Sequence, residues 1–341
     1  MVPFPWGRFL ERARAPERGR GAAAISPAWW AAKLALHFGL APLLARTSHA
    51  LVDLARRSRP DVVFIYRGLL VPPRVLAALR QAAPRAIIVG YNNDDPFAPA
   101  NPAWLWRHFL AALPHYDLAL AFRALNLAEF RAAGAPRVDL LRAWFVPWIH
   151  RPLALDPADR ERFDCDVAFI GHYEADGRLD LLEAVMQAGY RLRLFGANWH
   201  RAPPRAWLGR LAPIHPVFGD DYAKAVRGAK VALAFLSRRN RDSYTTRSFE
   251  IPACGGFMLS PFTPDLAALF REGREAEFFR SRDEMIAKIG CYRDDAEART
   301  RIAQAGRARV FTDGHDVMSR AAALIDRFAP LVAGRRLPGR S

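Results

Sequence analysis

The sequence predicts an α/β protein built from two Rossmann-like domains in tandem. Short apolar runs alternate with segments of helical period along most of the chain, which is the pattern of βα units on a largely parallel sheet. The chain has 341 residues, about twice the length of one typical domain. The alternation stops once, in an irregular stretch at 144–157 that contains three prolines. We therefore expect a hinge in this stretch.

The first half contains four apolar runs that we expect to form strands. They lie at 62–66, 86–90, 118–121 and 138–141. Helices are expected between them, at 73–82, 102–111 and 124–133. Before the first strand the chain is typical of an arginine-rich tail followed by two helices. We assign 1–60 to this tail and its atypical helices, and 61–150 to the first domain.

The second half repeats the alternating pattern. We expect strands at 166–170, 191–195, 214–218, 231–235, 257–260 and 277–279. Helices are expected at 177–188, 222–227 and 247–254. Two capping boxes, Ser281 with Glu284 and Asp294 with Glu297, predict further helices toward the C-terminus. We assign 151–330 to the second domain and 331–341 to a basic tail.

The chain is strongly basic, with a formal net charge of +16. Such a balance favours an anionic partner: nucleic acid, a membrane surface or a phosphorylated small molecule. Six of these charges belong to 1–20 and to three arginines near the C-terminus. The remainder is spread thinly and is accompanied by no motif of interleaved aromatic and basic residues, which argues against a nucleic-acid-binding module.

The cysteines and the N-terminus favour a cytoplasmic protein. Three cysteines stand far apart in no C-x-x-C spacing, so we expect neither a disulfide framework nor a zinc site. We find no signal-peptide pattern. The most apolar stretch, 27–45, falls short of a membrane-spanning helix and is typical of an amphipathic helix packed on the first domain. Trp29, Trp30 and the nearby arginines keep weak peripheral membrane attachment as an alternative.

The densest group of polar and small residues lies at 238–260, directly after an expected strand and before an expected helix. Ligands bind at this edge of open α/β sheets, and free backbone N–H groups at a helix start suit a phosphate. Asp242 and Glu250 are separated by seven residues, close enough for both carboxylates to meet one polyhydroxyl ligand. A solvated helix end is the alternative interpretation.

A second candidate loop follows the strand expected at 166–170. Gly171 allows a ligand to approach the backbone closely, and His172 follows it. Arg178, seven residues after Gly171, opens a helix where its guanidinium can grip a diphosphate. A structural loop histidine and an ordinary surface arginine are the alternatives. Among nearby aromatic residues, we select Tyr222 for the side of the site that would hold a base, although such residues are usually core.

Three stretches of the second half carry a family likeness. They are DVAFIGHYEADGRLDLLEAV from Asp166, RLRLFGANW from Arg191 and TRSFEIPACGGFMLSPFTPDLAALFREGREAEFF from Thr246. NNDDPF, which begins at Asn92, and the C-terminal helices add to it. The chain resembles glycosyltransferases of the CgeB and spore-maturation type, relatives of the group 1 glycosyltransferases. The likeness extends over about 60–328 and is most specific at 246–279.

This resemblance implies a GT-B fold: two Rossmann-like domains facing a cleft, with C-terminal helices. It implies that the second domain holds a nucleoside-diphosphate-sugar donor and that the first holds the acceptor. Residues 1–60 depart from the pattern, because a GT-B N-terminal half usually begins with a strand and a glycine-rich turn. Either the first βα unit is degenerate or replaced, or the chain is shortened at that end.

The resemblance also implies roles for individual residues. Glu250 matches the glutamate that binds the ribose hydroxyls. Asp242 matches the first acidic residue of an E-x7-E pattern that contacts the donor sugar, although here it is aspartate. Arg178 matches the basic residue that meets the diphosphate. The resemblance implies that the backbone of 243–247 forms the rest of the diphosphate site. Ser243, Thr246 and Arg247 are the residues of this segment that we expect at the donor, with Arg247 as a second cation.

Two aspartates, Asp94 and Asp95, lie in the loop that resembles the family's N-terminal acidic loop. We hypothesise that one of them orients the acceptor hydroxyl or accepts its proton, and we add His172 as a possible contact of donor phosphates or acceptor. An Asx turn or a helix cap before Pro96 is the alternative for the aspartates. We find no D-x-D motif that follows an expected strand and would demand Mg²⁺ or Mn²⁺, so we expect no metal and no cofactor besides the donor substrate.

The function we expect is transfer of a sugar from a nucleoside-diphosphate donor to a hydroxyl of a glycan, a lipid-linked glycan or a protein. The resemblance implies retention of the anomeric configuration, with a donor phosphate as the local base. Arginines and a helix N-terminus can stabilise the leaving diphosphate without a metal, and the enzyme class we expect is a hexosyltransferase. The alternative is a non-catalytic module of the same fold that binds a nucleotide or a partner in surface-polymer assembly.

Overall fold

The computed structural model describes residues 42–336, which form two compact units. Unit 1 comprises 42–142 together with 324–336, and unit 2 comprises 143–323. The units divide at Arg142 and Ala143, whereas we expected a boundary between 150 and 151. Most of the apolar stretch at 27–45 lies outside the described residues. Within 42–336, no helix combines the length and the apolar character needed to cross a membrane.

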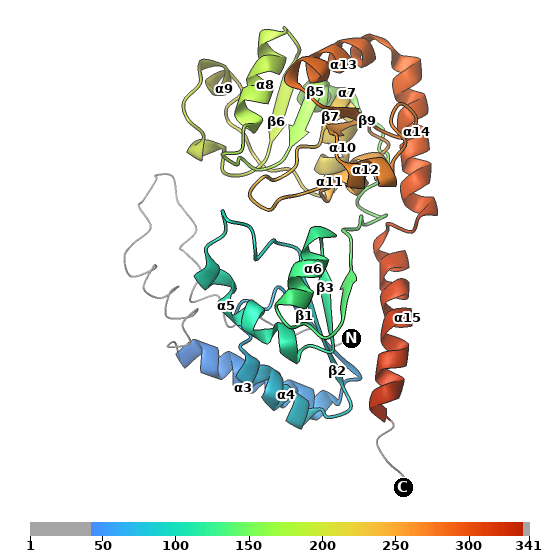
Figure 1. The fold of residues 1–341 in the computed structure, drawn as a ribbon. Helices are drawn as coiled ribbons and strands as arrows, with labels where there is room; N and C mark the ends of the chain where they lie inside the picture. Colours follow the sequence, from blue (N-terminus) through green and yellow to red (C-terminus); the bar gives the residue numbers. More distant parts are fainter. Residues whose placement is uncertain (1–41, 337–341) are drawn as a thin grey trace. The chain divides into compact units, whose positions relative to one another are not determined.

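Unit 1 contains a parallel sheet of four strands in its described part, in the order β1-β2-β3-β4 (Figure 1). The strands are β1 (Val62–Tyr66), β2 (Ile87–Asn92), β3 (Leu118–Ala121) and β4 (Val138–Leu140). The helices before and between them are α3 (Pro42–Ser58), α4 (Pro73–Ala82), α5 (Ala103–Ala112), η2 (Leu113–His115) and α6 (Leu125–Ala132). Each predicted strand of this unit is confirmed to within two residues at either end.

The core of unit 1 depends on one glycine in the sheet. A Cβ on Gly90, in β2, would lie 2.7 Å from the ring of Tyr116, so only glycine lets that ring pack onto the strand. Trp106, Phe109 and Phe130 are buried in the same core.

Unit 2 contains a second parallel sheet, of five strands in the order β6-β5-β7-β8-β9. The strands are β5 (Cys165–Ile170), β6 (Leu192–Phe195), β7 (Ala229–Leu233), β8 (Met258–Pro261) and β9 (Glu277–Phe279). The chain adds β6 on one side of β5 and then crosses to add β7 on the other side. The sheet therefore has a topological switch point between β5 and β7, and this point positions the candidate site.

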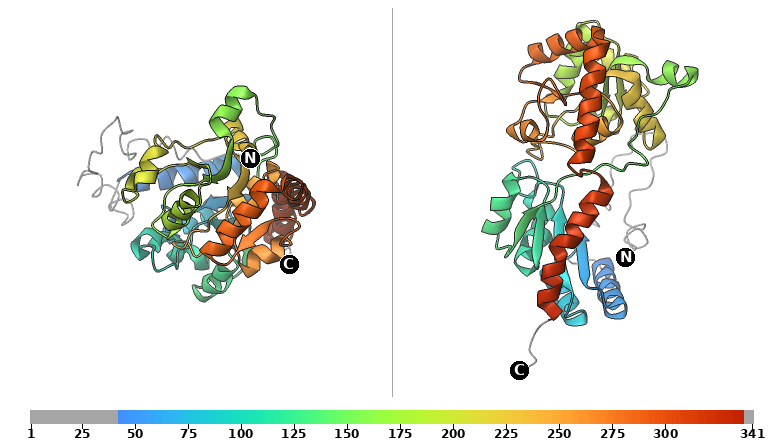
Figure 2. Two further views of the ribbon diagram at one scale, coloured as in Figure 1. Left: turned by 90° about the horizontal axis from the view of Figure 1, so that it is seen from above. Right: turned by 90° about the vertical axis from the view of Figure 1, so that its right-hand side faces the viewer.

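The helices of unit 2 surround this sheet (Figure 2). Helix α14 packs against both α11 and α13. They are α7 (Pro157–Phe163), α8 (Arg178–Gln187), η3 (Trp199–Arg201), α9 (Ala206–Arg210), α10 (Asp220–Gly228), α11 (Arg247–Ala253), α12 (Pro264–Leu269), α13 (Arg282–Asp294), α14 (Ala296–Thr312) and the beginning of α15 (Val317–Arg336). The predicted Ser281 cap of α13 is confirmed, since its side chain accepts from the N–H of Glu284. The cap of α14 is Asp295, one residue later than we predicted.

The strand predicted at 214–218 is wrong. These residues pass through unit 2 as an irregular segment, and within it the carbonyl of His215 accepts from the N–H of Gly196 at 3.0 Å. Pro213 and Pro216 lack the N–H groups that a strand in the interior of a sheet must donate. This apolar segment is therefore not part of a β-sheet.

Helix α15 begins in unit 2 and ends in unit 1, because the division falls between Ala323 and Leu324. In unit 1, Arg327 donates to the carbonyl of Leu140 at 2.9 Å and pairs with Asp139 at 3.0 Å. Residues 331–336, which we assigned to a basic tail, continue this helix, and the guanidinium of Arg335 pairs with Asp117.

Candidate functional site

The candidate site lies where β5 and β7 end, at the switch point of unit 2. β5 ends at Ile170 and is followed by the loop 171–177, which leads into α8. β7 ends at Leu233 and is followed by the loop 234–246, which leads into α11. Parallel neighbouring strands finish at one edge of a sheet, so the structure brings together the two loops that the sequence selected in its second half.

The loops after β5 and β6 touch through two glycines. A Cβ on Gly196 would fall 2.0 Å from the carbonyl oxygen of Gly171, and the φ of Gly196 is +148°. The N–H of Gly171 donates to Phe195 at 2.8 Å, and the Trp199 indole donates to the Gly171 carbonyl at 3.1 Å. A neighbouring loop of the same unit thus lies against the backbone of Gly171, and the approach of a ligand to Gly171 stays a prediction.

The guanidinium of Arg178 is buried and its charge is matched by acids. It forms two hydrogen bonds with Asp176, at 2.7 and 2.6 Å, and lies 3.4 Å from Glu174. Nη1 of the same guanidinium donates to the carbonyl of His172 at 2.6 Å. A diphosphate would have to replace or share these partners, so the role predicted for Arg178 stays a prediction.

Glu174 connects the two loops of the site. Its carboxylate lies 2.6 Å from Nε2 of His172, whose ring is half-exposed, and accepts from the hydroxyl of Ser237 in the loop after β7, also at 2.6 Å. Burial opposes ionisation, but hydrogen bonds from His172 and Ser237 and the charge of Arg178 outweigh it and lower the pKa of Glu174 to about 2. Glu174 is therefore an ionised link between the end of β5 and the loop after β7.

The loop 234–246 is held in place by polar contacts along its length. The N–H of Asp242 donates to the Ser237 carbonyl at 2.9 Å, which folds the loop back on itself. The hydroxyl of Ser243 donates to Asp265 at 2.6 Å, and the hydroxyl of Thr263 donates to the Ser243 carbonyl at 2.6 Å. The backbone predicted to cradle a phosphate is thus anchored to the residues around the start of α12.

Helix α11 carries two of the predicted site residues, the cation Arg247 and the carboxylate Glu250. Thr246 precedes it, and the Thr246 carbonyl accepts from the N–H of Glu250 at 3.1 Å. Arg247 reaches across to the end of β5, where its Nε donates to the Ile170 carbonyl at 3.1 Å. The Glu250 side chain lies one turn further along and keeps 15% of its surface exposed. A cation and a carboxylate are therefore presented by one short helix at the switch point.

Two residues flank Glu250 inside unit 2. Nε2 of His150 lies 3.7 Å from Oε1 of Glu250, and the His150 ring meets the Tyr222 ring edge to face at 5.4 Å. Tyr222, which we expected on the base side of the site, is buried beside Glu250, and its hydroxyl has no hydrogen-bond partner of regular geometry. Burial lowers the pKa of His150, against the opposing effect of the Glu250 charge, and the charge of Arg247 lowers it further.

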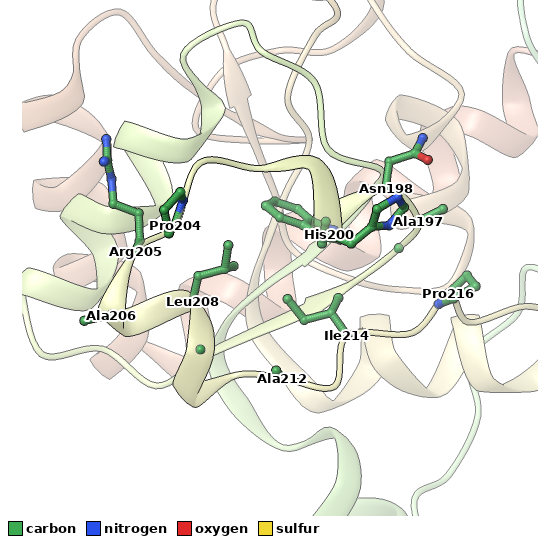
Figure 3. Close-up of a pocket in the computed structure, with 13 residues that line it drawn as sticks. Ala197, Asn198, His200, Pro204, Arg205, Ala206, Leu208, Ala212, Ile214 and Pro216 are labelled. Atoms are coloured by element: carbon green, nitrogen blue, oxygen red, sulfur yellow. The ribbon is translucent and has the colours of Figure 1, made fainter. Parts of the chain in front are cut away.

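A recess of about 850 Å³ opens beside this site, beyond the end of β6 (Figure 3). It begins at Gly196, the glycine that touches Gly171, and extends to α9 and to the segment around Pro216. Its walls are mostly apolar and include Ala197, Pro204, Leu208 and Ile214, with polar groups from Asn198 and His200. Its size and lining suit a flat organic ring with a few polar atoms.

Asp94 and Asp95 follow β2 in unit 1. The carboxylate of Asp94 forms an ion pair with Arg67 and stays partly exposed. Asp95 is fully buried, and its Oδ1 accepts from the N–H of Phe97 at 3.0 Å and from the amide of Asn126 at 2.9 Å. Asp95 therefore forms the Asx turn that we gave as the alternative, which leaves Asp94 as the aspartate able to meet a ligand.

Comparisons with known proteins identify the fold. Residues 178–326 match the sequence model of a family described as glycosyl transferase-like, and a comparison with curated protein sequences finds no match. Among solved structures, Anabaena HepE in complex with UDP and glucose is 15% identical, with a TM-score of 0.64 over 86% of this chain and 82% of HepE.

Two further solved structures agree. Sucrose-phosphate synthase from Thermosynechococcus elongatus is 12% identical, with a TM-score of 0.63 over 86% of this chain and 79% of its own. The α,α-trehalose 6-phosphate synthase from Burkholderia multivorans is 14% identical, with a TM-score of 0.64 over 97% and 82%. This chain has the GT-B fold. The GT-B class that we predicted, with two Rossmann-like units, is confirmed, while the narrower CgeB likeness stays a prediction.

Several features of this GT-B site escaped the sequence analysis. Glu174 lies in a loop that we had marked only for Gly171, His172 and Arg178. His150 lies in the stretch that we interpreted as a linker, and the structure includes it in unit 2. The glycine of FGANW, Gly196, directly follows a predicted strand, and that position was the one available signal for its close contact. In the described residues, no group of three His, Cys, Asp or Glu side chains is arranged to hold a metal ion.

Proposed function

We propose that this GT-B protein is a glycosyltransferase, that unit 2 binds a nucleoside-diphosphate-sugar donor and that unit 1 binds the acceptor. The observation that carries the proposal is the arrangement on α11, where Arg247 and Glu250 stand one turn apart at the switch point of a parallel sheet. A cation for the diphosphate and a carboxylate for a diol are the two groups that such a donor needs. The match of 178–326 to a glycosyl transferase-like family and the UDP bound to HepE support it.

For the diphosphate we assign Arg247 together with backbone N–H groups of 243–247. Arg247 makes one hydrogen bond to a carbonyl, whereas Arg178 is already surrounded by carboxylates. We therefore give Arg178 and Glu174 the task of holding the loop after β5, with His172 at its exposed face. Asp242 is assigned to the donor sugar, as the resemblance implies.

For the nucleoside we assign Glu250 to the ribose hydroxyls and the recess beyond β6 to the base. A carboxylate accepts two hydrogen bonds from a vicinal diol, and an apolar recess suits the faces of a base. The recess begins at Gly196, which touches Gly171, so it lies next to the loop after β5.

In the reaction, the bond between the anomeric carbon and the oxygen of the β-phosphate breaks, and a bond from the acceptor oxygen to that carbon forms. The nucleoside diphosphate leaves with the electron pair, and Arg247 stabilises its charge. We propose retention of configuration, with the acceptor proton passing to the departing phosphate oxygen. We propose that Asp94 orients the acceptor hydroxyl.

The proposal extends to a hexosyltransferase that works without a metal ion, in the cytoplasm. The acceptor is a hydroxyl of a glycan, a lipid-linked glycan or a protein. Weak attachment to an anionic membrane through the basic ends of the chain is part of the same proposal. Deletion of 1–20 and 337–341 is expected to reduce binding to anionic vesicles and to leave nucleotide binding unchanged.

A nucleotide panel tests the donor assignment. Thermal unfolding is measured with UDP, GDP, ADP, CDP and dTDP, and with the corresponding free nucleosides. We expect at least one diphosphate to raise the melting temperature more than its nucleoside does, and Glu250→Ala to weaken that effect. No stabilisation by any diphosphate would overturn the donor assignment. Binding without hydrolysis or transfer of the matching nucleotide sugar would instead identify a non-catalytic GT-B module.

A further inference from the structure

Three residues from separate parts of unit 2 meet beside the proposed donor site. His150 comes from the segment that precedes α7, Tyr222 from α10 and Glu250 from α11. We infer that His150 and Tyr222 are positioning residues that present the Glu250 carboxylate to the vicinal diol of a ribose. This inference rests on the proposed assignment of Glu250 to the ribose and adds the groups that make the carboxylate selective for a diol.

The orientation of the His150 ring is fixed by the backbone. The N–H of Val146 donates to Nδ1 of His150 at 3.0 Å, so Nδ1 is an acceptor and the proton of the neutral ring is on Nε2. Nε2 of His150, which carries this proton, lies 3.7 Å from Oε1 of Glu250. Burial favours the neutral ring by lowering the pKa of His150, which maintains this tautomer near neutral pH.

Tyr222 supplies a second group beside the same carboxylate. Its hydroxyl is fully buried and has no hydrogen-bond partner of regular geometry, and the acceptor close to it is the Glu250 carboxylate. Burial and then the nearby charge of Glu250 raise the pKa of Tyr222 well above its ordinary value, so the hydroxyl keeps its proton and can only donate toward the carboxylate. The edge-to-face contact with His150 holds the two rings together.

The number of acceptor positions on a carboxylate explains why this arrangement would select a diol. An ionised carboxylate has roughly four lone-pair positions. With the His150 N–H and the Tyr222 O–H directed at two of them, two remain, and these match the two hydroxyls of a ribose. A small movement of the carboxylate on ligand binding would shorten the 3.7 Å separation from His150 and bring the Tyr222 hydroxyl into regular hydrogen-bond geometry with the carboxylate.

Matched ribonucleotide and deoxyribonucleotide pairs test this inference. Calorimetry gives the dissociation constants of UDP, GDP, ADP and CDP and of their 2′-deoxy forms for the parent, Tyr222→Phe, His150→Ala and His150→Gln. We expect the parent to bind one ribonucleotide about tenfold more tightly than its 2′-deoxy form, because one hydrogen bond to a charged group is lost. Tyr222→Phe and His150→Ala should remove most of that preference and leave affinity for the 2′-deoxy form unchanged. His150→Gln, which keeps a donor group, should restore part of it.

The outcomes separate this inference from the proposed function. Variants that keep the full preference for the ribonucleotide, or that lose affinity for both members of a pair equally, would overturn the positioning role. A parent protein that binds neither member of any pair would overturn the donor assignment, and this inference with it. Tyr190→Phe is the control, because it also removes a tyrosine hydroxyl from unit 2, near Gly290. It should leave every ratio unchanged.

Discussion

Gly196 and Gly171 lie backbone against backbone at the edge of the sheet of unit 2. A Cβ on Gly196 would come within 2.0 Å of the Gly171 carbonyl oxygen, and the φ of +148° is one that side chains with a Cβ rarely adopt. This contact joins the loop after β6, where the recess begins, to the loop after β5, which carries His172 and leads to Arg178.

Gly196→Ala should therefore destabilise unit 2 by about 3 kcal/mol or more, through both backbone strain and overlap. The obstacle is a carbonyl of a hydrogen-bonded loop, which cannot rotate away as a flexible side chain would. Urea unfolding measures the change. Gly209→Ala is the matched control: it lies in α9 with no other atom within 4 Å of an added Cβ, so its stability should stay equal or rise. Equal stability of the two variants would contradict the strain argument.

Arg247→Ala should weaken binding of a nucleoside diphosphate by about tenfold or more and leave binding of the free nucleoside unchanged, because only the diphosphate contact is lost. Calorimetry with both ligands gives the ratio, and Arg247→Lys should lie between the parent and the alanine variant. The control is Arg227→Ala, a surface arginine of unit 2 that donates to the Gly255 carbonyl at 2.8 Å. An equal loss for nucleoside and diphosphate would argue against the phosphate role.

Glu174 should make the stability of the protein depend on acid pH. Its pKa in the folded chain, about 2, lies below the ordinary value of 4.5, so its ionisation stabilises the fold above pH 4.5 and this contribution is lost as the pH falls toward 2. Glu174→Gln should cost on the order of 2 kcal/mol at pH 7, after allowance for solvent screening, and progressively less below pH 4.5. Unfolding of both proteins at pH 7, 4 and 3 tests this. A difference in stability between the two proteins that does not change with pH would show that ionised Glu174 does not stabilise the fold.

The two aspartates after β2 should respond differently to substitution. Asp95→Ala removes the acceptor of two hydrogen bonds at a fully buried site and should cost about 2 kcal/mol or more of stability. Asp94→Ala removes a partly exposed ion pair with Arg67 and should cost less than about 1 kcal/mol. If Asp94 orients the acceptor, its removal should lower kcat/KM for acceptor by about tenfold or more, with donor affinity unchanged. Unaltered transfer by Asp94→Ala would exclude that role.

Much of the fold could be predicted because local pattern and tertiary environment agree. Buried strands such as 118–121 and 277–279 were found at their observed bounds, since buried parallel strands are short apolar runs. The prediction failed at 214–218, where the same composition is interrupted by Pro213 and Pro216 and forms no ladder. It also missed the return of α15 to unit 1, because helical periodicity does not reveal what a helix packs against.

The site could be predicted only where several of its residues lie close together in one short segment of the sequence. The sequence selected the loops after β5 and β7, and the structure brings them to one sheet edge. It did not reveal that Arg178 is matched by Asp176 and Glu174, since such pairing depends on loop conformation. His150 is about a hundred residues from Glu250 along the chain, and without an alignment no local signal connects them.

The path of α15 determines where the chain can be cut to exchange one unit for that of another protein. The chain leaves unit 1 after Arg142 and re-enters it after Ala323, so unit 1 is assembled from two separate stretches while unit 2 is one continuous insertion. A single recombination junction cannot exchange unit 1 intact. A chimera that exchanges the donor-side unit needs two junctions, one near 142 and 143 and one inside a helix, and the second must preserve helical phase for Arg327 to meet Asp139.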